Sequence, residues 1–153
     1  GAYFASQYHF IHSSQVQGIA MFAGGPFYCS GGVVATALTI CMKDPGLIVD
    51  LTLRTLYAGF EAAGEIDNLK NLERSKVFLF GGTRDHVINQ GVVKHAEAIY
   101  RHYGASVKTE YSLDAEHAVI TDKYGTACHE FVSPYINNCG YDGAYEAISH
   151  ILD

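Results

Sequence analysis

The chain has 153 residues, a length that suits one compact domain and is marginal for two. Hydrophobic residues make up 48% of it and charged residues 17%, so a packed core is expected and intrinsic disorder is excluded. Ten basic residues stand against 16 acidic ones, for a formal net charge of −6, and the basic residues are scattered singly. We therefore expect no nucleic-acid partner. No apolar run approaches the roughly 20 residues of a transmembrane helix, so no such segment is expected either.

The first predicted element is a helix over residues 3–11, which carries apolar side chains on nearly every side. A helix of this kind is expected to be buried. Residues 18–23 then form a short apolar run that ends at Gly24-Gly25-Pro26. This pattern is typical of a strand buried on both faces of a parallel sheet.

A short helix is expected over residues 33–40, and a longer one from Pro45 to about Ala63. Proline is favoured at the first position of a helix. Apolar residues repeat at helical spacing along the longer segment, and Gly64 suits the position just after its end.

The remaining elements alternate between strand and helix. They are a buried strand over 76–80, a helix over 91–103, a strand over 106–113 that lies nearer an edge, and a helix over 143–152. This alternation predicts βαβ units, and hence an α/β fold with parallel strands flanked by helices. Three strands are few for such a sheet, so we expect the chain to lack strands on its N-terminal side.

The four cysteines fall in two local pairs, at 29 and 41 and at 128 and 139. Four cysteines allow three pairings, and their positions alone do not choose among them. Local disulfides would fasten two loops, as in many secreted proteins, whereas four buried thiols would suit a cytosolic protein. Zinc is less favoured, because no CxxC spacing occurs.

Two polar loops follow the second and third predicted strands. Asp85 lies in the first loop and His117 in the second, with one helix between them. Functional groups of open α/β sheets collect at the carboxyl ends of the strands. An acid followed by a histidine is also the order in which α/β-hydrolases place the last two members of a Ser-His-Asp triad. The imidazole would move the proton of a serine hydroxyl, and the carboxylate would set its tautomer.

Other readings remain open at this point. Asp85 could be a turn residue and His117 a surface histidine, and Asp114 and Asp122 are rival acids. The remaining candidates are the histidine pairs 9/12 and 95/102. They have no acidic partners at metal-binding spacing, so we expect no metal site and interpret them as partly exposed structural histidines. No phosphate-binding glycine loop is present, and no cofactor is expected.

Four stretches make the chain similar, over nearly its whole length, to the extracellular poly(3-hydroxybutyrate) depolymerase and feruloyl/acetylxylan esterase group of α/β-hydrolases. Residues 1–5, GAYFA, resemble the start of the helix behind the nucleophile, and residues 23–29, AGGPFYC, resemble the depolymerase segment AGGPYYC. Residues 82–87, GTRDHV, resemble the acid loop G-x-x-D-x-x-V apart from one residue in the count. The most specific match is INNCGYD at 136–142, close to the C-terminal run INxCGYD.

The resemblance implies that residues 1–153 are the C-terminal part of a single α/β-hydrolase catalytic domain. Asp85 would be the triad acid and His117 the general base, and the disulfides would be Cys29–Cys41 and Cys128–Cys139. One departure is Glu116, where the group usually has glycine just before the histidine. A carboxylate there would either favour the protonated imidazole or point to solvent. Separately, Phe27 and Tyr28 lie beside a strand end, where they could line an acyl pocket.

The nucleophile is not among the serines at 6, 13 and 14, which lie on or after the first helix. If Gly1 is the last glycine of GxSxG, the serine lies two residues upstream on an absent elbow, and the chain alone is expected to be inactive. The function predicted for the longer protein is a secreted serine esterase acting on carboxylic esters, including short-chain polyhydroxyalkanoates. The alternative is an inactive hydrolase-fold subunit that serves a structural or binding role. A third arrangement is a cut precursor whose N-terminal half stays associated as a partner.

Overall fold

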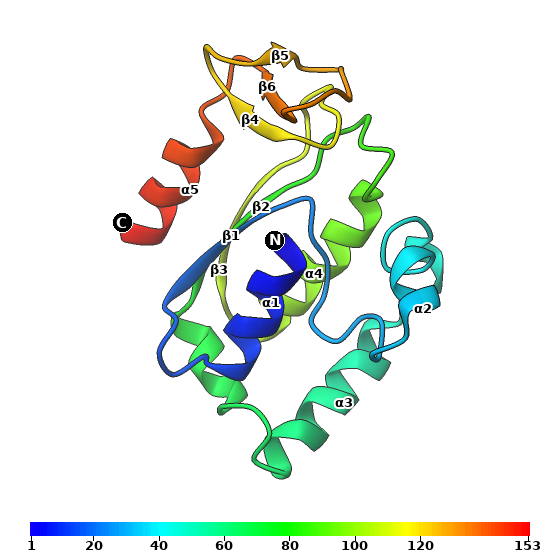
Figure 1. The fold of residues 1–153 in the computed structure, drawn as a ribbon. Helices are drawn as coiled ribbons and strands as arrows, with labels where there is room; N and C mark the ends of the chain where they lie inside the picture. Colours follow the sequence, from blue (N-terminus) through cyan, green and yellow to red (C-terminus); the bar gives the residue numbers. More distant parts are fainter.

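The computed structural model describes all 153 residues and contains a central sheet of three parallel strands in the order β1-β2-β3. The strands are β1 (Gly18–Phe22), β2 (Lys76–Phe80) and β3 (Ser106–Glu110), and they form the core of the ribbon in Figure 1. Their first residues pair in register, Gly18 with Lys76 and Lys76 with Ser106, so their carboxyl ends meet at one edge. The predicted α/β fold is confirmed, and β3 lies at a sheet edge as expected.

The central strand β2 is buried on both faces, whereas the edge strands β1, predicted to be buried on both faces, and β3 are mostly half-buried. Successive side chains of a strand point to opposite faces. On one face, Met21, Val77 and Leu79 belong to the larger hydrophobic core. On the other face, Phe78 and Phe80 belong to a smaller core. The continuous apolar sequence of β2 therefore has a partner on each side, which explains why it shows no polar alternation.

Helices cover the two faces unequally. The helices α1 (Ala2–Ile11) and α4 (Gln90–His102) pack on the face of the larger core, and α5 (Gly143–Leu152) packs on the other face. Figure 1 shows α1 in front of the sheet and α5 on the opposite side. Side-chain caps define where two of these helices begin: Asn89 accepts the amide of Gly91, and Asp142 accepts the amide of Tyr145.

The first helix is only partly buried, which corrects the expectation that all its sides are covered. Ser6, His9 and Phe10 face the core, whereas Phe4 is 71% exposed and Tyr8 is also exposed. The helix packs against β1 and contacts α4 and the first disulfide loop, whereas the side that carries Phe4 and Tyr8 is exposed. Composition alone does not show this, because an all-apolar helix can have an uncovered face.

The segment between β1 and β2 is helical but more broken than predicted. It contains α2 (Val34–Leu38), the 3₁₀ turn η1 (Pro45–Leu47), α3 (Asp50–Ala62) and the 3₁₀ helix η2 (Leu69–Arg74). Pro45 thus begins a separate turn, and α3 starts only at Asp50. Gly64 has the positive φ, +72°, expected of a residue just beyond a helix end.

A second, small parallel sheet was not predicted. It consists of β4 (Val119–Thr121), β5 (Thr126–Ala127) and β6 (Ile136–Asn138), in the order β4-β6-β5. It lies beyond the carboxyl edge of the main sheet, at the top of Figure 1.

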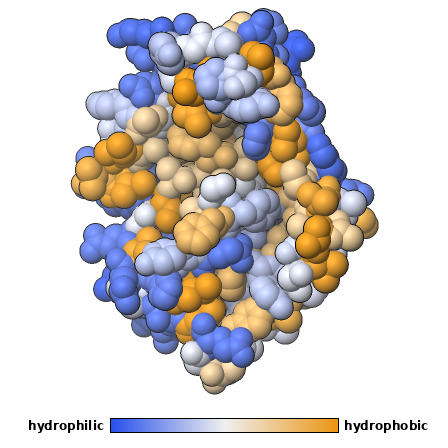
Figure 2. Space-filling view, viewed as in Figure 1, coloured by the Kyte–Doolittle hydropathy of each residue, from blue (hydrophilic) through white to orange (hydrophobic).

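Two disulfides are present, Cys29–Cys41 and Cys128–Cys139, and they match the pairing implied by the resemblance. The first disulfide closes the loop that contains α2. The second joins the residue just after β5 to the residue just after β6. None of the helices is long and apolar enough to cross a membrane. Figure 2 shows apolar side chains on the outer helices at both sides of this view, over α2 and toward the end of α5.

Candidate active site

Two loops meet at the carboxyl edge of the main sheet, one after β2 and one after β3. Their backbones are joined by hydrogen bonds from the amide of Thr83 to the carbonyl of Leu113, 3.0 Å, and from Arg84 to Ala115, 3.2 Å. A Cβ added at Gly82 would lie 2.1 Å from the carbonyl oxygen of Ala115. The loops therefore pack backbone against backbone, and glycine at 82 is what permits the close approach.

Asp85 and His117 are brought together where these loops meet. The Oδ2 atom of Asp85 lies 2.9 Å from Nδ1 of His117, although 32 residues separate them. The other carboxylate oxygen, Oδ1, accepts the amides of Val87 at 2.8 Å and Ile88 at 2.7 Å. The Asp85 side chain is 0% exposed, so its orientation is fixed by these three bonds. Because a carboxylate accepts hydrogen bonds, Nδ1 of His117 is the donor.

His117 is arranged to exchange a proton with a third group. Its side chain is 34% exposed, and its second nitrogen, Nε2, has no hydrogen-bond partner within the chain. With Nδ1–H held by Asp85, Nε2 carries the lone pair and can accept a proton from a nucleophile. This is the arrangement that general base catalysis requires.

Pointing to solvent was one of the two expectations for Glu116, and the structure does not show it. Its carboxylate binds the ring of His86, with Nδ1 2.8 Å from Oε1 and 2.9 Å from Oε2. It also accepts the amide of His117 at 3.1 Å and that of His86 at 3.4 Å. Burial acts to raise the pKa of Glu116, but the hydrogen bonds from the His86 ring and the two amides outweigh it, and the pKa lies below its usual value.

The rival acids have other partners. Asp114 pairs with Arg84, with Oδ1 2.5 Å from Nε, and both side chains are well exposed. Asp122 lies 3.5 Å from Nζ of the neighbouring Lys123. Neither is hydrogen-bonded to His117, so geometry favours Asp85.

The remaining candidates from the sequence are not near this pair. Among the serines, Ser6 donates to the carbonyl of Tyr3, and Ser14 donates to Asp67. No group of three or more His, Cys, Asp or Glu side chains is arranged to hold a metal ion. The interpretation of His9 as partly exposed is wrong: it is completely buried and is hydrogen-bonded through both ring nitrogens.

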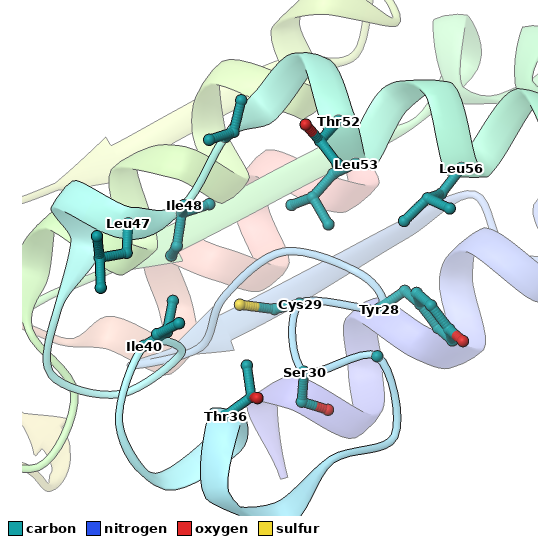
Figure 3. Close-up of a pocket in the computed structure, with 12 residues that line it drawn as sticks. Tyr28, Cys29, Ser30, Thr36, Ile40, Leu47, Ile48, Thr52, Leu53 and Leu56 are labelled. Atoms are coloured by element: carbon teal, nitrogen blue, oxygen red, sulfur yellow. The ribbon is translucent and has the colours of Figure 1, made fainter.

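The two predicted pocket residues lie in different surroundings. Phe27 is buried in the larger core, where its ring stacks on that of Phe10. Tyr28 lines a hollow of about 270 Å³ between the first disulfide loop and α3, where Leu53 and Leu56 point toward the loop (Figure 3).

Tyr28 also lines a second, mainly apolar hollow, of about 500 Å³, between α1 and the same disulfide loop. Ile88, whose amide binds Asp85, contributes to its wall. The second hollow is therefore the one that connects the disulfide loop with the acid loop.

No family model matches the chain. The chain is 37% identical over 154 residues to a poly(3-hydroxybutyrate) depolymerase of Delftia acidovorans, covering 99% of this chain and 31% of that protein. It is 29% identical over 157 residues to a polyhydroxybutyrate depolymerase of Talaromyces funiculosus, covering 99% and 45%. The chain thus spans less than half the length of these curated relatives.

Two solved structures have the same fold over nearly the whole chain. One is a PHB depolymerase in complex with an R3HB trimer, with a TM-score of 0.82, 28% identity, and coverage of 97% of this chain and 47% of that one. The other is the PHB depolymerase of Penicillium funiculosum, with a TM-score of 0.81, 27% identity, and coverage of 98% and 48%.

Proposed function

We propose that the chain is part of a serine esterase, because it is similar over nearly its whole length to poly(3-hydroxybutyrate) depolymerases. In this proposal Asp85 and His117 are the acid and the base of a Ser-His-Asp triad. The serine comes from sequence that precedes Gly1 in a longer protein. The observation that carries the proposal is the 2.9 Å bond between Asp85 and His117 on adjacent strand-end loops.

The proposed substrates are carboxylic esters of short-chain hydroxyacids, including their polyesters. The curated relatives are named as depolymerases of such a polyester, and one solved neighbour is in complex with an R3HB trimer. An ester of this kind is uncharged apart from its end groups, which suits the mainly apolar hollow beside Tyr28 and Ile88. Tyr28 is accordingly proposed as a substrate-binding residue.

The proposed chemistry has two halves. The serine hydroxyl attacks the ester carbonyl while Nε2 of His117 takes its proton, and the same proton then goes to the departing alkoxide. In the second half, Nε2 takes a proton from water as the water attacks the acyl-enzyme, and returns it to the serine oxygen. Throughout, Asp85 keeps Nδ1–H of His117 in place and stabilises the imidazolium.

The longer protein is proposed to be secreted. Both cysteine pairs form disulfides and no free cysteine remains, which is typical of proteins that fold in an oxidising compartment.

The proposal is tested with the full-length protein, by measuring hydrolysis of p-nitrophenyl butyrate and of an R3HB trimer. His117→Ala is expected to lower kcat by about 10⁴-fold or more, because the general base is lost. The matched control is His129→Ala, since His129 is an exposed histidine outside the two loops, and wild-type rates are expected for it. Equal rates for the wild type and His117→Ala would overturn the proposal and favour the alternative, a non-catalytic subunit with a hydrolase fold.

The proposed partner of this chain is the segment that carries the serine. It is either continuous with Gly1 or a separate piece that stays bound after cleavage of the precursor. Mass spectrometry of the purified protein distinguishes the two, because a second, co-purifying polypeptide is expected only after cleavage.

A further inference from the structure

Three successive residues of the acid loop pair with three residues of the histidine loop. The loop that supplies the acid alternates from pair to pair: Arg84 with Asp114 at 2.5 Å, Asp85 with His117 at 2.9 Å, and His86 with Glu116 at 2.8 Å. Each loop thus supplies one acid and one histidine to two adjacent acid–histidine pairs. The proposed triad uses only the middle pair, which leaves the role of the third to be explained.

The carboxylate of Glu116 is the point where the two loops are joined most closely. It is bound by two groups of His86, the ring and the amide, and by the backbone amide of His117 itself. The amide of Glu116 in turn donates to the carbonyl of Cys128, at 3.0 Å, and Cys128 is fixed by a disulfide. The backbone at residues 116 and 117 is therefore fastened to two other segments, the acid loop through His86 and the disulfide-bonded Cys128.

The carboxylate of Glu116 is less exposed than either member of the Arg84–Asp114 pair. The Glu116 side chain is 13% exposed and that of its partner His86 is 55% exposed, whereas Asp114 and Arg84 are 61% and 59% exposed. Exposed ion pairs contribute little, because water and salt screen them. A partly buried carboxylate that accepts several N–H groups is held much more firmly.

We propose that Glu116 is a positioning residue of the esterase, holding His117 against Asp85 by binding the His117 backbone and the His86 ring. This inference rests on the proposed function. His86 acts as the anchor on the acid loop, where its own ring packs edge-on against Phe131 at 4.4 Å between centroids. The carboxylate at 116 thus supports the position of His117, although the related enzymes usually have glycine there.

The alternative is that Glu116 only stabilises the fold. In that case its removal would lower the melting temperature but leave the active-site geometry and kcat per folded molecule unchanged. A positioning role instead predicts a loss of kcat per folded molecule. KM should change little, since the substrate-binding hollow is lined by other residues. The bond from His117 to Asp85 should also weaken, and its Nδ1 proton reports on this directly.

The test compares Glu116→Gly and Glu116→Gln with Asp114→Asn as the matched control, all in the full-length protein. Glu116→Gly is expected to lower kcat by about 10- to 100-fold, because small misplacement of a reacting group has effects of this size. KM should change by less than about three-fold, and Glu116→Gln should fall between, since its amide keeps one acceptor oxygen. Asp114→Asn removes an exposed carboxylate from the same loop and is expected to change kcat by less than about two-fold.

A second readout does not depend on activity. The low-field proton NMR resonance of His117 Nδ1–H should be sharp in the wild type and in Asp114→Asn, and broadened or lost in Glu116→Gly. Wild-type kcat together with an unchanged resonance in Glu116→Gly would overturn the inference. If Glu116→Gly does not fold, Glu116→Gln decides by the same two readouts. Absence of esterase activity in the wild type would overturn the proposed function, while the resonance would still test the positioning role.

Discussion

The Asp85 carboxylate divides its two oxygens between different tasks. Oδ1 binds the amides of Val87 and Ile88, and Oδ2 binds His117. The amides can only donate, so they determine which end of the side chain faces the histidine. This division lets a conservative substitution be predicted in detail.

Asp85→Asn should place its carbonyl oxygen on the two amides and turn its NH₂ group toward Nδ1 of His117. Nδ1 would then have to accept, the ring proton would move to Nε2, and Nε2 could no longer take a proton from a serine. We expect kcat for p-nitrophenyl butyrate to fall by about 10⁴-fold with the fold intact.

Asp122→Asn is the control for that experiment, because Asp122 is close in sequence to His117 but lies beside Lys123. Its kcat should equal that of the wild type. A comparable loss in both variants would mean that Asp85 has no special role.

The sequence predicted the partners of this bond but not their surroundings. Asp85 and His117 each follow a buried strand, so their meeting at one sheet edge follows from parallel topology. The pairing of His86 with Glu116 depends on the exact shape of two loops, and no periodic pattern encodes loop shape. For the same reason, the turn of Phe27 into the core was not foreseen.

At the scale of elements, one buried histidine joins three segments. His9 on α1 contacts Tyr100 on α4 through Nδ1 and Ser75, just before β2, through Nε2, each at 3.0 Å. Burial lowers the pKa of His9 to about 4, against a smaller opposing effect of a backbone hydrogen bond. The histidine is therefore neutral in the folded protein at neutral pH.

This depressed pKa predicts acid sensitivity. The unfolded chain takes up a proton at His9 near pH 6.5, whereas the folded chain resists it until about pH 4. The stabilisation is thus complete above pH 6.5 and is lost as the pH falls toward 4. From linkage we expect His9 to account for about 2 kcal/mol of the loss in unfolding free energy between pH 7 and pH 5.

Urea denaturation at pH 7 and pH 5 measures this effect. His9→Gln retains a polar side chain without a titrating group, so it should be less stable at pH 7 but lose less stability on acidification. The same pH dependence in both proteins would show that other groups cause it.

The elements themselves were predicted to different degrees. The strand β2 and the helix α5 have the predicted bounds, because a long apolar run or a clear helical period marks them. The small sheet was missed, because strands of two or three residues are too short to show an alternating pattern. Its pairing of β4 with β6 joins residues 17 positions apart, such as Val119 and Ile136, and no local signal marks such contacts.

For the whole molecule, the two disulfides close loops of similar length at different places in the fold. Their sequence separations are 12 for Cys29–Cys41 and 11 for Cys128–Cys139. Replacing either pair with serines should lower the unfolding free energy by about 3 kcal/mol, because cross-links over loops of similar length restrict the unfolded chain similarly.

The activities of these two variants should differ. The carbonyl of Cys128 accepts the amide of Glu116, so loss of the second disulfide is expected to lower kcat per folded molecule as well. Urea midpoints and kcat of both variants check this prediction. An equal loss of kcat in the two variants would show that the second disulfide has no particular effect on the active site.

The most direct test of the account uses a p-nitrophenyl phosphonate ester, which reacts only with an activated nucleophile. Mass spectrometry of the treated full-length protein locates the adduct, and release of p-nitrophenol gives its rate of formation. We predict an adduct on a serine that precedes Gly1, formed at least about 10³-fold more slowly in the His117→Ala variant. An adduct on a serine within residues 1–153, or the same rate without His117, would contradict it.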